Sequence, residues 1–395
     1  MILDKAFPPD TRVNNEADIL IAIGIEVHIL CFSSIENPQE EENLNGIHIH
    51  RLKKGSRYIS WGRGLINTYF DYYSIYLKSE IDIFIKKYNL DILHVHDLYL
   101  MKAVSLVSKN IPVVLDMHEN YVDGLDYYKF SNTWIGKLLI SKNRWRKFER
   151  DYSRKADWII TVVEEMKNRI ASVTNKEEII VYSNYVNLEV FYKCPLNNDL
   201  INKYKKYYVL SYIGGFDYHR GIFTLIDAVP TIIQTILNLK VLLIGKGKII
   251  NEIKSRIQAL NIQNYIDIIP WISPQELPNY FRISNIGVIP HIKSVQTDNS
   301  SPNKLFQYMT AGKPVVVSDC ISLERIVKGS RCGAVFQSNN HLDLSNSITD
   351  IYENFDKYKL MGKNGISAVK NKYNTQISGR ELVHLYETIN ADIKQ

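Results

Sequence analysis

A pair of glycines followed by an arginine carries the clearest chemical signal in the sequence. Gly214 and Gly215 end an apolar run, and Arg220 precedes a helical pattern. Glycine lets the backbone approach a ligand closely, the first amides of a helix attract phosphate, and arginine adds a charged, two-pronged donor. The segment predicts a phosphate-binding turn. A tight strand-to-helix turn with an exposed arginine is the alternative that these residues leave open.

A second segment that could meet an anion begins at Thr297. Three residues of types that cap helices stand here before a proline suited to a first helical turn. They are Asn299, Ser300 and Ser301, followed by Pro302. Lys304 lies one turn into the expected helix, within reach of a phosphate bound at its N-terminus. The alternative is an ordinary capped amphipathic helix that ends at Gly312.

Histidines follow two of the expected strands. His118 and Glu119 come directly after the apolar run Val113–Met117, where the binding cleft of an α/β fold opens. A structural role for His118 is the alternative. His94, His96 and Asp97 follow another apolar run, and alternation along a strand places the two histidines on one face and the carboxylate on the other. We therefore predict no metal site.

The loop from Lys5 to Arg12 is stiffened by two prolines and has polar ends, Asp10 and Arg12. It has two interpretations. One is a loop that faces the acceptor of a reaction, and the other is a rigid connection between the first strand and the first helix.

The elements that must position these residues form two series of apolar runs with helical patterns between them. Most runs are continuous in Val, Ile and Leu, which is typical of parallel sheets covered on both faces. The first series is Glu26–Cys31, Asp91–Val95, Val113–Met117, Trp158–Val162 and Ile179–Tyr182. The second series is Tyr208–Ile213, Lys240–Ile244, Tyr265–Ile269, Ile286–Ile289 and Pro314–Ser318. The alternation predicts an α/β fold.

The stretch from Ser183 to Tyr207 separates the two series and is rich in Asn, Tyr and Lys. We expect an N-terminal domain over residues 1–190, a C-terminal domain over 191–375, and a C-terminal helix over 376–395 that packs on either domain. Ligands of open α/β sheets bind at the carboxyl ends of the strands, so a cleft is expected there.

Composition bounds the class of protein. The 395 residues carry a formal net charge of +6, and four scattered cysteines form neither a zinc pattern nor a disulfide framework. No signal peptide or membrane span is expected, which favours a cytoplasmic protein. Basic residues concentrate in Arg51–Arg63 and Trp134–Trp158. These segments predict an anionic partner such as a membrane surface, whereas no nucleic-acid-binding module is present.

At these segments the chain resembles glycosyltransferase family 4, whose members are retaining transferases. The resemblance spans nearly the whole length and rests on the order and spacing of several motifs. They are Phe7-Pro-Pro-Asp-Thr-Arg-Val with Glu16-Ala17, Asp116-Met-His-Glu, Ser183-Asn-Tyr-Val-Asn, Gly214-Gly215 with Arg220-Gly221, Leu243-Ile-Gly-Lys-Gly, and Ser301-Pro-Asn-Lys-Leu-Phe-Gln-Tyr-Met.

The resemblance implies the GT-B fold, with two Rossmann-like doubly wound domains that face a central cleft. It implies that Arg220 and Lys304 bind the diphosphate of a nucleotide sugar, and that His118 lies by the donor sugar and the acceptor. The donor would also meet Gly214, Gly215, Gly245, Ser300, Ser301, Pro302, Asn303, Leu305 and Gln307. Asp10, Arg12, His118 and Glu119 would form the acceptor side.

Three positions depart from the family pattern, and one of them is Gly215, where the family usually has an arginine that would assist Arg220. The family usually carries two glutamates eight positions apart where this chain has Asn299 and Gln307. Neutral amides still form hydrogen bonds, but the carboxylate charge is lost. Asn299 is nevertheless counted with His118, Arg220 and Lys304 among the expected catalytic residues.

The resemblance implies transfer of a hexose-type sugar, with retention and without a metal ion or cofactor, to a glycan or a polyprenyl-diphosphate-linked glycan at the inner face of the membrane. Surface polysaccharide synthesis is the expected setting. Two alternatives stay open, a nucleotide-sugar epimerase or hydrolase of the same fold and a nucleotide-sugar-binding protein with weak catalysis.

Overall fold

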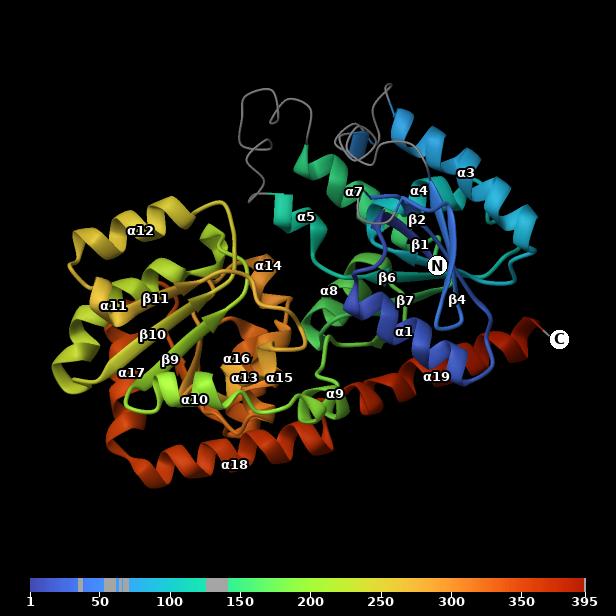
Figure 1. The fold of residues 1–395 in the computed structure, drawn as a ribbon. Coiled ribbons are helices and arrows are strands. Elements are labelled where there is room, and N and C mark those ends of the chain that lie inside the picture. The colour runs from blue at the N-terminus through green and yellow to red at the C-terminus, as the bar shows by residue number, and fades with distance from the viewer. Residues whose placement is uncertain (35–37, 53–61, 64–65, 67–70, 126–140, 394–395) are drawn as a thin grey trace. The chain divides into compact units, whose positions relative to one another are not determined.

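The computed structural model describes residues 1–34, 38–52, 62–63, 66, 71–125 and 141–393. Most of the basic segment Arg51–Arg63, and residues 134–140 of Trp134–Trp158, lie outside this part. The chain forms two compact units (Figure 1). The N-terminal unit is Met1–Ser183 together with Ser378–Gln395, and the C-terminal unit is Asn184–Ile377.

The N-terminal unit is built on one eight-stranded sheet in the order β3-β4-β2-β1-β5-β6-β7-β8. All neighbours are parallel except β3 and β4. The strands are β1 (Ile2–Ala6), β2 (Val27–Phe32), β3 (Glu41–Leu44), β4 (Ile47–Leu52), β5 (Leu93–His96), β6 (Val113–Met117), β7 (Trp158–Thr161) and β8 (Ile179–Val181). The helices are α1 (Thr11–Ala22), α3 (Tyr72–Tyr88), α4 (Met101–Ser105), α5 (Tyr121–Gly124), α7 (Lys142–Ser153), α8 (Glu164–Thr174) and α19 (Thr375–Ile393).

The C-terminal unit holds a six-stranded, fully parallel sheet in the order β11-β10-β9-β12-β13-β14. The strands are β9 (Tyr208–Ile213), β10 (Leu239–Ile244), β11 (Ile266–Ile269), β12 (Ile286–Ile289), β13 (Val315–Ser318) and β14 (Gly333–Phe336). The helices are α9 (Leu188–Lys193), α10 (Asn198–Tyr204), α11 (Ile222–Thr235), α12 (Ile250–Ala259), α13 (Leu277–Ile283), α14 (Val295–Asp298), α15 (Asn303–Thr310), α16 (Ile321–Ser330), α17 (His341–Glu353) and α18 (Phe355–Asn371).

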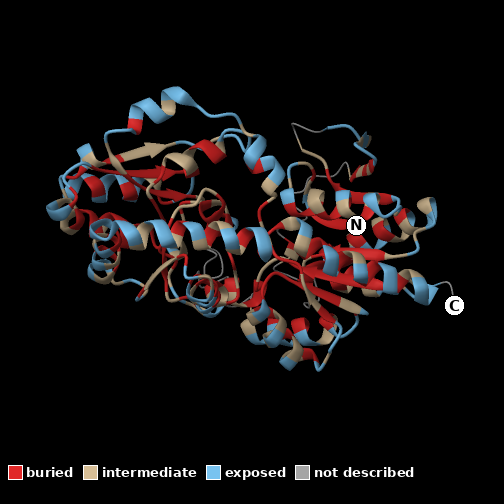
Figure 2. Cartoon of the chain, turned by 90° about the horizontal axis from the view of Figure 1, so that it is seen from below, coloured by how far each residue is buried: buried red, intermediate tan, exposed pale blue. Residues whose placement is uncertain are grey.

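Helices cover both faces of each sheet, so the central strands are buried on both sides. All residues of β10, β12 and β13 are buried, and the two faces of this sheet belong to two separate apolar clusters. Figure 2 shows the strands buried along most of their length, while the helices expose their outer sides. The prediction of an α/β fold with doubly wound parallel sheets is confirmed, because continuous apolar runs form strands that are covered on both faces.

Each sheet reverses its strand order at one point, and that point fixes where ligands can bind. In the N-terminal unit the reversal lies between β1 and β5, and in the C-terminal unit between β9 and β12. Loops leaving the carboxyl ends of these neighbouring strands run in opposite directions and leave a crevice. The residues that follow β1, β5, β9 and β12 are therefore the candidates for chemistry.

Helix α19 returns from the C-terminal unit to the N-terminal unit. Its residues Leu382, Leu385 and Ile389 are buried in the apolar cluster that also holds the inner side of α1. The predicted domain limits were 190 and 375, whereas the units in the structure meet at 183–184 and 377–378. Within the described residues, the helices are all too short or too polar to cross a bilayer.

Three strands were not predicted, β3, β4 and β14. Three of the four residues of β3 are polar, and β4 begins by alternating isoleucine with histidine, so neither resembles the continuous apolar runs of the sheet centre. They form an antiparallel pair at the edge of the sheet, where one side of a strand meets water.

Candidate functional site

Two glycine turns lie together at the carboxyl edge of the C-terminal sheet. Gly214 follows β9 with a φ of 149°, and Gly245 follows β10 with a φ of 150°. A Cβ atom on Gly245 would lie 1.9 Å from the Gly214 carbonyl oxygen, and one on Gly214 would lie 2.7 Å from the Nζ atom of Lys304. Only glycine fits both positions. Gly215, in contrast, has room for a Cβ atom, which would make an ordinary contact with the Oδ2 atom of Asp217 at 3.7 Å.

Lys304 projects from the first turn of α15 toward the Gly214 turn. The residue is 8% exposed, and its Nζ atom has no hydrogen-bond partner among the described residues. This atom lies 3.9 Å from the centre of the Tyr212 ring. Burial, reinforced by the charge of Arg220, lowers the pKa of Lys304 well below its usual range. A buried amine without a partner is costly, so a negatively charged ligand would stabilise it.

Arg220 lies in the short 3-10 turn Tyr218–Arg220 that leads into α11. Its Nη1 atom is 3.3 Å from the Nε2 atom of His291, which is fully buried two residues beyond β12. Burial and the charges of Arg220 and Lys304 lower the pKa of His291, and burial with Arg220 lowers the pKa of His219 to about 4. Asp217 acts on His219 in the opposite direction.

Basic groups therefore gather at the reversal point of the C-terminal sheet. We call Lys304, Arg220, His219 and His291 the basic cluster. Within the described residues, Arg220 forms no ion pair with a carboxylate, and its side-chain contact is with His291. The N-cap residues are Gly221 for α11 and Pro302 for α15, and no side chain caps either N-terminus. Uncapped amides and basic side chains that lack a carboxylate partner together suit a phosphate or diphosphate, whose charge would favour their protonated forms.

The predicted caps of α15 are wrong. Asn299 closes the short helix α14 instead, and its Nδ2 atom donates to the Val295 carbonyl at 2.7 Å. Ser300 donates to the Thr297 carbonyl, and the buried hydroxyl of Ser301 has no partner in the described structure. The reason is that α14, which starts with a capping box of Ser294 and Thr297, takes up the residues that precede α15.

The remaining predicted donor residues take different positions on α15. Asn303 is exposed in its first turn, and Gln307 is half-buried one turn later. The Leu305 side chain is fully buried in the core, so this residue could meet a ligand only through its backbone.

In the N-terminal unit, Arg12 and Asp116 form a buried ion pair. The Nε and Nη2 atoms of Arg12 donate to the two carboxylate oxygens of Asp116 at 2.8 and 2.6 Å. The Nη1 atom donates to the Tyr182 carbonyl at 2.6 Å. Although burial opposes the charge of Asp116, Arg12 and His118 hold its pKa well below the usual range.

This arrangement changes the interpretation of the loop before α1. Arg12 is 7% exposed and lies in the first turn of the helix, where it joins α1 to β6 and to the end of β8. Asp10 is the N-cap of α1 and accepts from the amides of Arg12 and Val13. Both side chains thus fit the rigid connection that we gave as the second interpretation, and the acceptor contact stays a prediction.

His118 lies beside this ion pair with 15% of its side chain exposed. Its Nε2 atom is 2.8 Å from Asp116 Oδ2 and 2.9 Å from His96 Nδ1. Burial opposes protonation of His118, but the charges of Asp97 and Asp116 outweigh it and raise its pKa. The half-buried Glu119 follows it. The raised pKa favours the protonated form of His118, in which both ring nitrogens donate hydrogen bonds.

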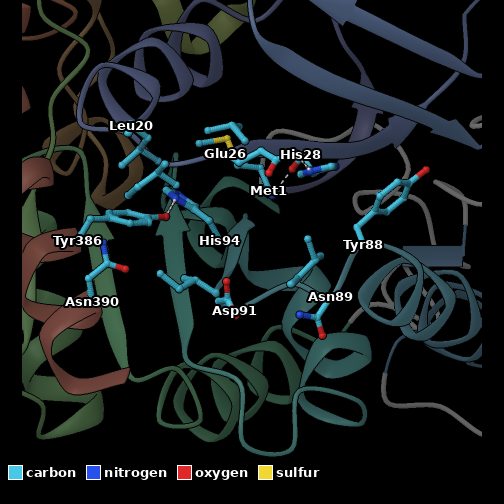
Figure 3. Close-up of a pocket in the computed structure, with 15 residues that line it drawn as sticks. Met1, Leu20, Glu26, His28, Tyr88, Asn89, Asp91, His94, Tyr386 and Asn390 are labelled. Carbon is cyan, nitrogen blue, oxygen red and sulfur yellow. Dashed lines mark hydrogen bonds and ion pairs between the residues drawn. The ribbon is translucent and has the colours of Figure 1, made fainter. Parts of the chain in front are cut away.

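Sequence reasoning gave no site role to Glu16, Tyr182, Tyr212 or His291, although Glu16 stands in one of the family motifs. Glu16 lies 3.5 Å from His94 through Oε2 and Nε2, and burial next to Asp116 raises the pKa of Glu16. The other side of the His94 ring meets the Tyr386 hydroxyl of α19 at 2.7 Å, as Figure 3 shows. No short motif marks these partners, since 292 positions separate His94 from Tyr386.

Two protein-family models match the chain. "Glycosyltransferase Family 4" matches residues 11–190, and "Glycosyl transferases group 1" matches residues 197–368. The chain is 27% identical over 344 residues to an uncharacterized glycosyltransferase of Methanocaldococcus jannaschii, which covers 86% of this chain and 84% of the relative.

A second relative is the capsular polysaccharide biosynthesis glycosyltransferase CapM of Staphylococcus aureus, 24% identical over 241 residues, or 58% of this chain and 61% of CapM. Among solved structures, the Anabaena protein HepE in complex with UDP-glucose shares the fold with a TM-score of 0.70 at 13% identity, over 98% of both chains.

Proposed function

Because this chain is a GT-B glycosyltransferase that belongs to the family 4 type, we propose that its C-terminal unit binds a nucleoside-diphosphate hexose. The sugar is passed to a glycan or lipid-linked glycan, with retention of its anomeric configuration and without a metal ion. One observation carries the proposal. The buried Lys304 amine has no hydrogen-bond partner among the described residues, and it lies in a cluster with Arg220 at the strand reversal of an α/β sheet.

The chemistry follows from the charge of the leaving group. When the sugar departs, negative charge builds on the β-phosphate of the nucleoside diphosphate. Arg220, Lys304 and the uncapped amides of α11 and α15 are cationic or electropositive groups that stabilise that charge. The raised pKa of His118 makes it a hydrogen-bond donor for the sugar or the acceptor. Retention without a covalent intermediate means that the acceptor attacks from the face that the diphosphate leaves.

The neutral amides at Asn299 and Gln307 limit how the donor is held. The Nδ2 atom of Asn299 already donates a hydrogen bond to the Val295 carbonyl in α14. The Oδ1 atom of Asn299 is then the one that can accept a hydrogen bond from the sugar. Gln307 can still bond hydroxyl groups, without the charge of a carboxylate. The basic cluster then supplies most of the electrostatic stabilisation.

For the donor and the acceptor, we propose a chemical class rather than a single compound. UDP-glucose is the ligand of HepE, so a UDP-hexose is the first donor to test. CapM is named for capsular polysaccharide synthesis, which favours an envelope glycan as acceptor. The basic segments of the N-terminal unit suit an anionic carrier or membrane surface, and we place the protein at the cytoplasmic face of the membrane.

Replacing Arg220 by alanine tests this function. Loss of one group that stabilises charge in the transition state typically lowers kcat about 100- to 1000-fold. We expect a loss of this size in the rate at which the protein consumes the donor when an extract that contains the acceptor is present. Arg256→Ala is the matched control, since this arginine is exposed on α12 and pairs with Asp227. Near-normal turnover by Arg220→Ala would remove Arg220 from the mechanism. Consumption of donor without any acceptor would instead indicate an epimerase or hydrolase.

A further inference from the structure

A cluster of histidines and carboxylates lies on one face of the N-terminal sheet. His28 of β2 and His48 of β4 are directly opposite in the parallel ladder, and their rings stack with centres 4.7 Å apart. The Oε1 atom of Glu26 is 3.0 Å from His28 Nε2 and 3.6 Å from His48 Nε2. All three ligand-type atoms lie within 4.8 Å of one another.

Two imidazoles and one carboxylate are a common ligand set for zinc and related ions. Ligands of a tetrahedral zinc lie about 3.3 Å apart, as follows from metal–ligand bonds of roughly 2.0–2.1 Å. The spacing in the cluster approaches this value, and Glu26 is 71% exposed, so its side chain can adjust. From this geometry we propose that Glu26, His28 and His48 bind a divalent transition-metal ion of the zinc class.

The groups around His28 prepare it as a ligand. Its Nδ1 atom is 3.1 Å from His50 Nε2, and His50 Nδ1 is 3.8 Å from the carboxylate of Glu41. Glu41 is held in turn by Lys87 and Tyr88. His50 Nε2 can accept the proton of His28 Nδ1, which leaves the His28 Nε2 lone pair for the metal.

Three protein ligands leave at least one coordination position open. Glu26 and His28 lie at a cavity of about 290 Å³, which Tyr88, Asn89 and Asp91 also line (Figure 3). The start of β2 and the start of β5 border this cavity, so it lies at the end of the sheet away from His118. Water or a small anionic ligand in the cavity can complete the coordination of the ion.

A second set of groups in the same unit is a poorer metal site. Glu16, His94, His96 and Asp116 also come within 4.8 Å of one another. However, the guanidinium of Arg12 contacts both carboxylates, and all four residues are fully buried. A cation there would be repelled by Arg12 and would need to shed all its water. The exposed cluster has neither obstacle.

Zn²⁺ titration of the full-length, chelator-treated protein tests the proposal by calorimetry, with visible absorption of Co²⁺ as a second signal. We expect one ion per chain. Glu26→Gln and His48→Gln should weaken binding by more than the roughly ten- to hundredfold that loss of an outer partner costs, and His50→Gln by about that amount. His384→Gln, on the exposed side of α19, is the matched control and should bind as the wild type does.

Two results would overturn the proposal. One is the absence of stoichiometric Zn²⁺ uptake by the wild-type chain. The other is uptake that survives in Glu26→Gln and is lost in Glu16→Gln, which would assign the ion to the buried groups. Circular dichroism melts of each variant check that folding is retained, and Glu26→Gln changes only an exposed side chain.

Discussion

Each unit buries a basic side chain near the carboxyl ends of its strands, and the two have opposite surroundings. In the N-terminal unit, Arg12 meets the carboxylate of Asp116 through two hydrogen bonds and a carbonyl through a third. In the C-terminal unit, the Nζ atom of Lys304 has an aromatic ring and other basic groups beside it and no hydrogen-bond partner among the described residues.

The difference separates a structural ion pair from a binding group. A buried charge that is paired within the fold recovers part of the free energy lost when it leaves water. Its partners also fix the arrangement of the elements that carry them. An uncompensated one costs stability until a ligand arrives. By this comparison Arg12 is part of the scaffold, and Lys304 is part of the binding site.

The largest expected effect is on stability, and it comes from breaking the ion pair between Arg12 and Asp116. Asp116→Ala removes the carboxylate that accepts two hydrogen bonds from the buried Arg12 and leaves Glu16 at 3.1 Å beside it. Loss of one partner of such a buried pair costs about 3–5 kcal/mol. Urea denaturation measures the change in the free energy of unfolding. Lys86→Ala is the control, because its pair with Asp82 is exposed on α3 and should contribute less than about 1 kcal/mol. A loss as small as the control's would show that Arg12 finds other partners.

Lys304→Met should not reduce the free energy of unfolding, in contrast to Asp116→Ala. It removes a buried amine that lacks a partner and keeps a side chain of similar length, so the free energy of unfolding should stay equal or rise. Donor turnover should nevertheless fall about 100- to 1000-fold, as for other groups that stabilise developing charge. A variant that is both destabilised and fully active would reverse the assignment of Lys304.

The pH dependence of stability sharpens the comparison. Because the folded-state pKa of Lys304 lies below its ordinary value of 10.5, the unfolded chain binds more protons between these two values. The free energy of unfolding contributed by this group should therefore rise with pH across that window. Subtracting the pH profile of Lys304→Met from that of the wild type isolates the rise. A flat difference would mean that Lys304 already has a partner.

The smallest expected effect concerns Asn299. Its hydrogen bond to Val295 closes α14, so Asn299→Ala should cost about 1 kcal/mol of stability, the ordinary contribution of one hydrogen bond. Turnover should fall much less than in Lys304→Met. A loss of turnover equal to that of Lys304→Met, with unchanged stability, would instead give Asn299 a direct role in catalysis.

Local patterns in the sequence predicted the sheet centres and the glycine turns. The run Val315–Ser318 is buried on both faces, and Gly214 stands where a Cβ atom would collide with Lys304. Such features depend on residues that are close together in the chain. Each also requires particular residue types, apolar for the buried strand and glycine for the turn, that few other local structures require.

Long-range pairings and short polar elements were not predictable in the same way. Arg12 and Asp116 are 104 positions apart, and their types also suit an exposed loop and a cleft. Asn299 is a good cap for either of two helices, and nothing local indicates that α14 would take it. His291 becomes part of the basic cluster only because β12 lies beside β9 in the sheet.

The most direct test is a crystal structure of the protein with UDP bound. The account predicts oxygens of the β-phosphate within hydrogen-bonding distance of the Lys304 amine and the Arg220 guanidinium, next to the Gly214 turn. A diphosphate bound away from both side chains, with the Lys304 amine still lacking a partner, would contradict it.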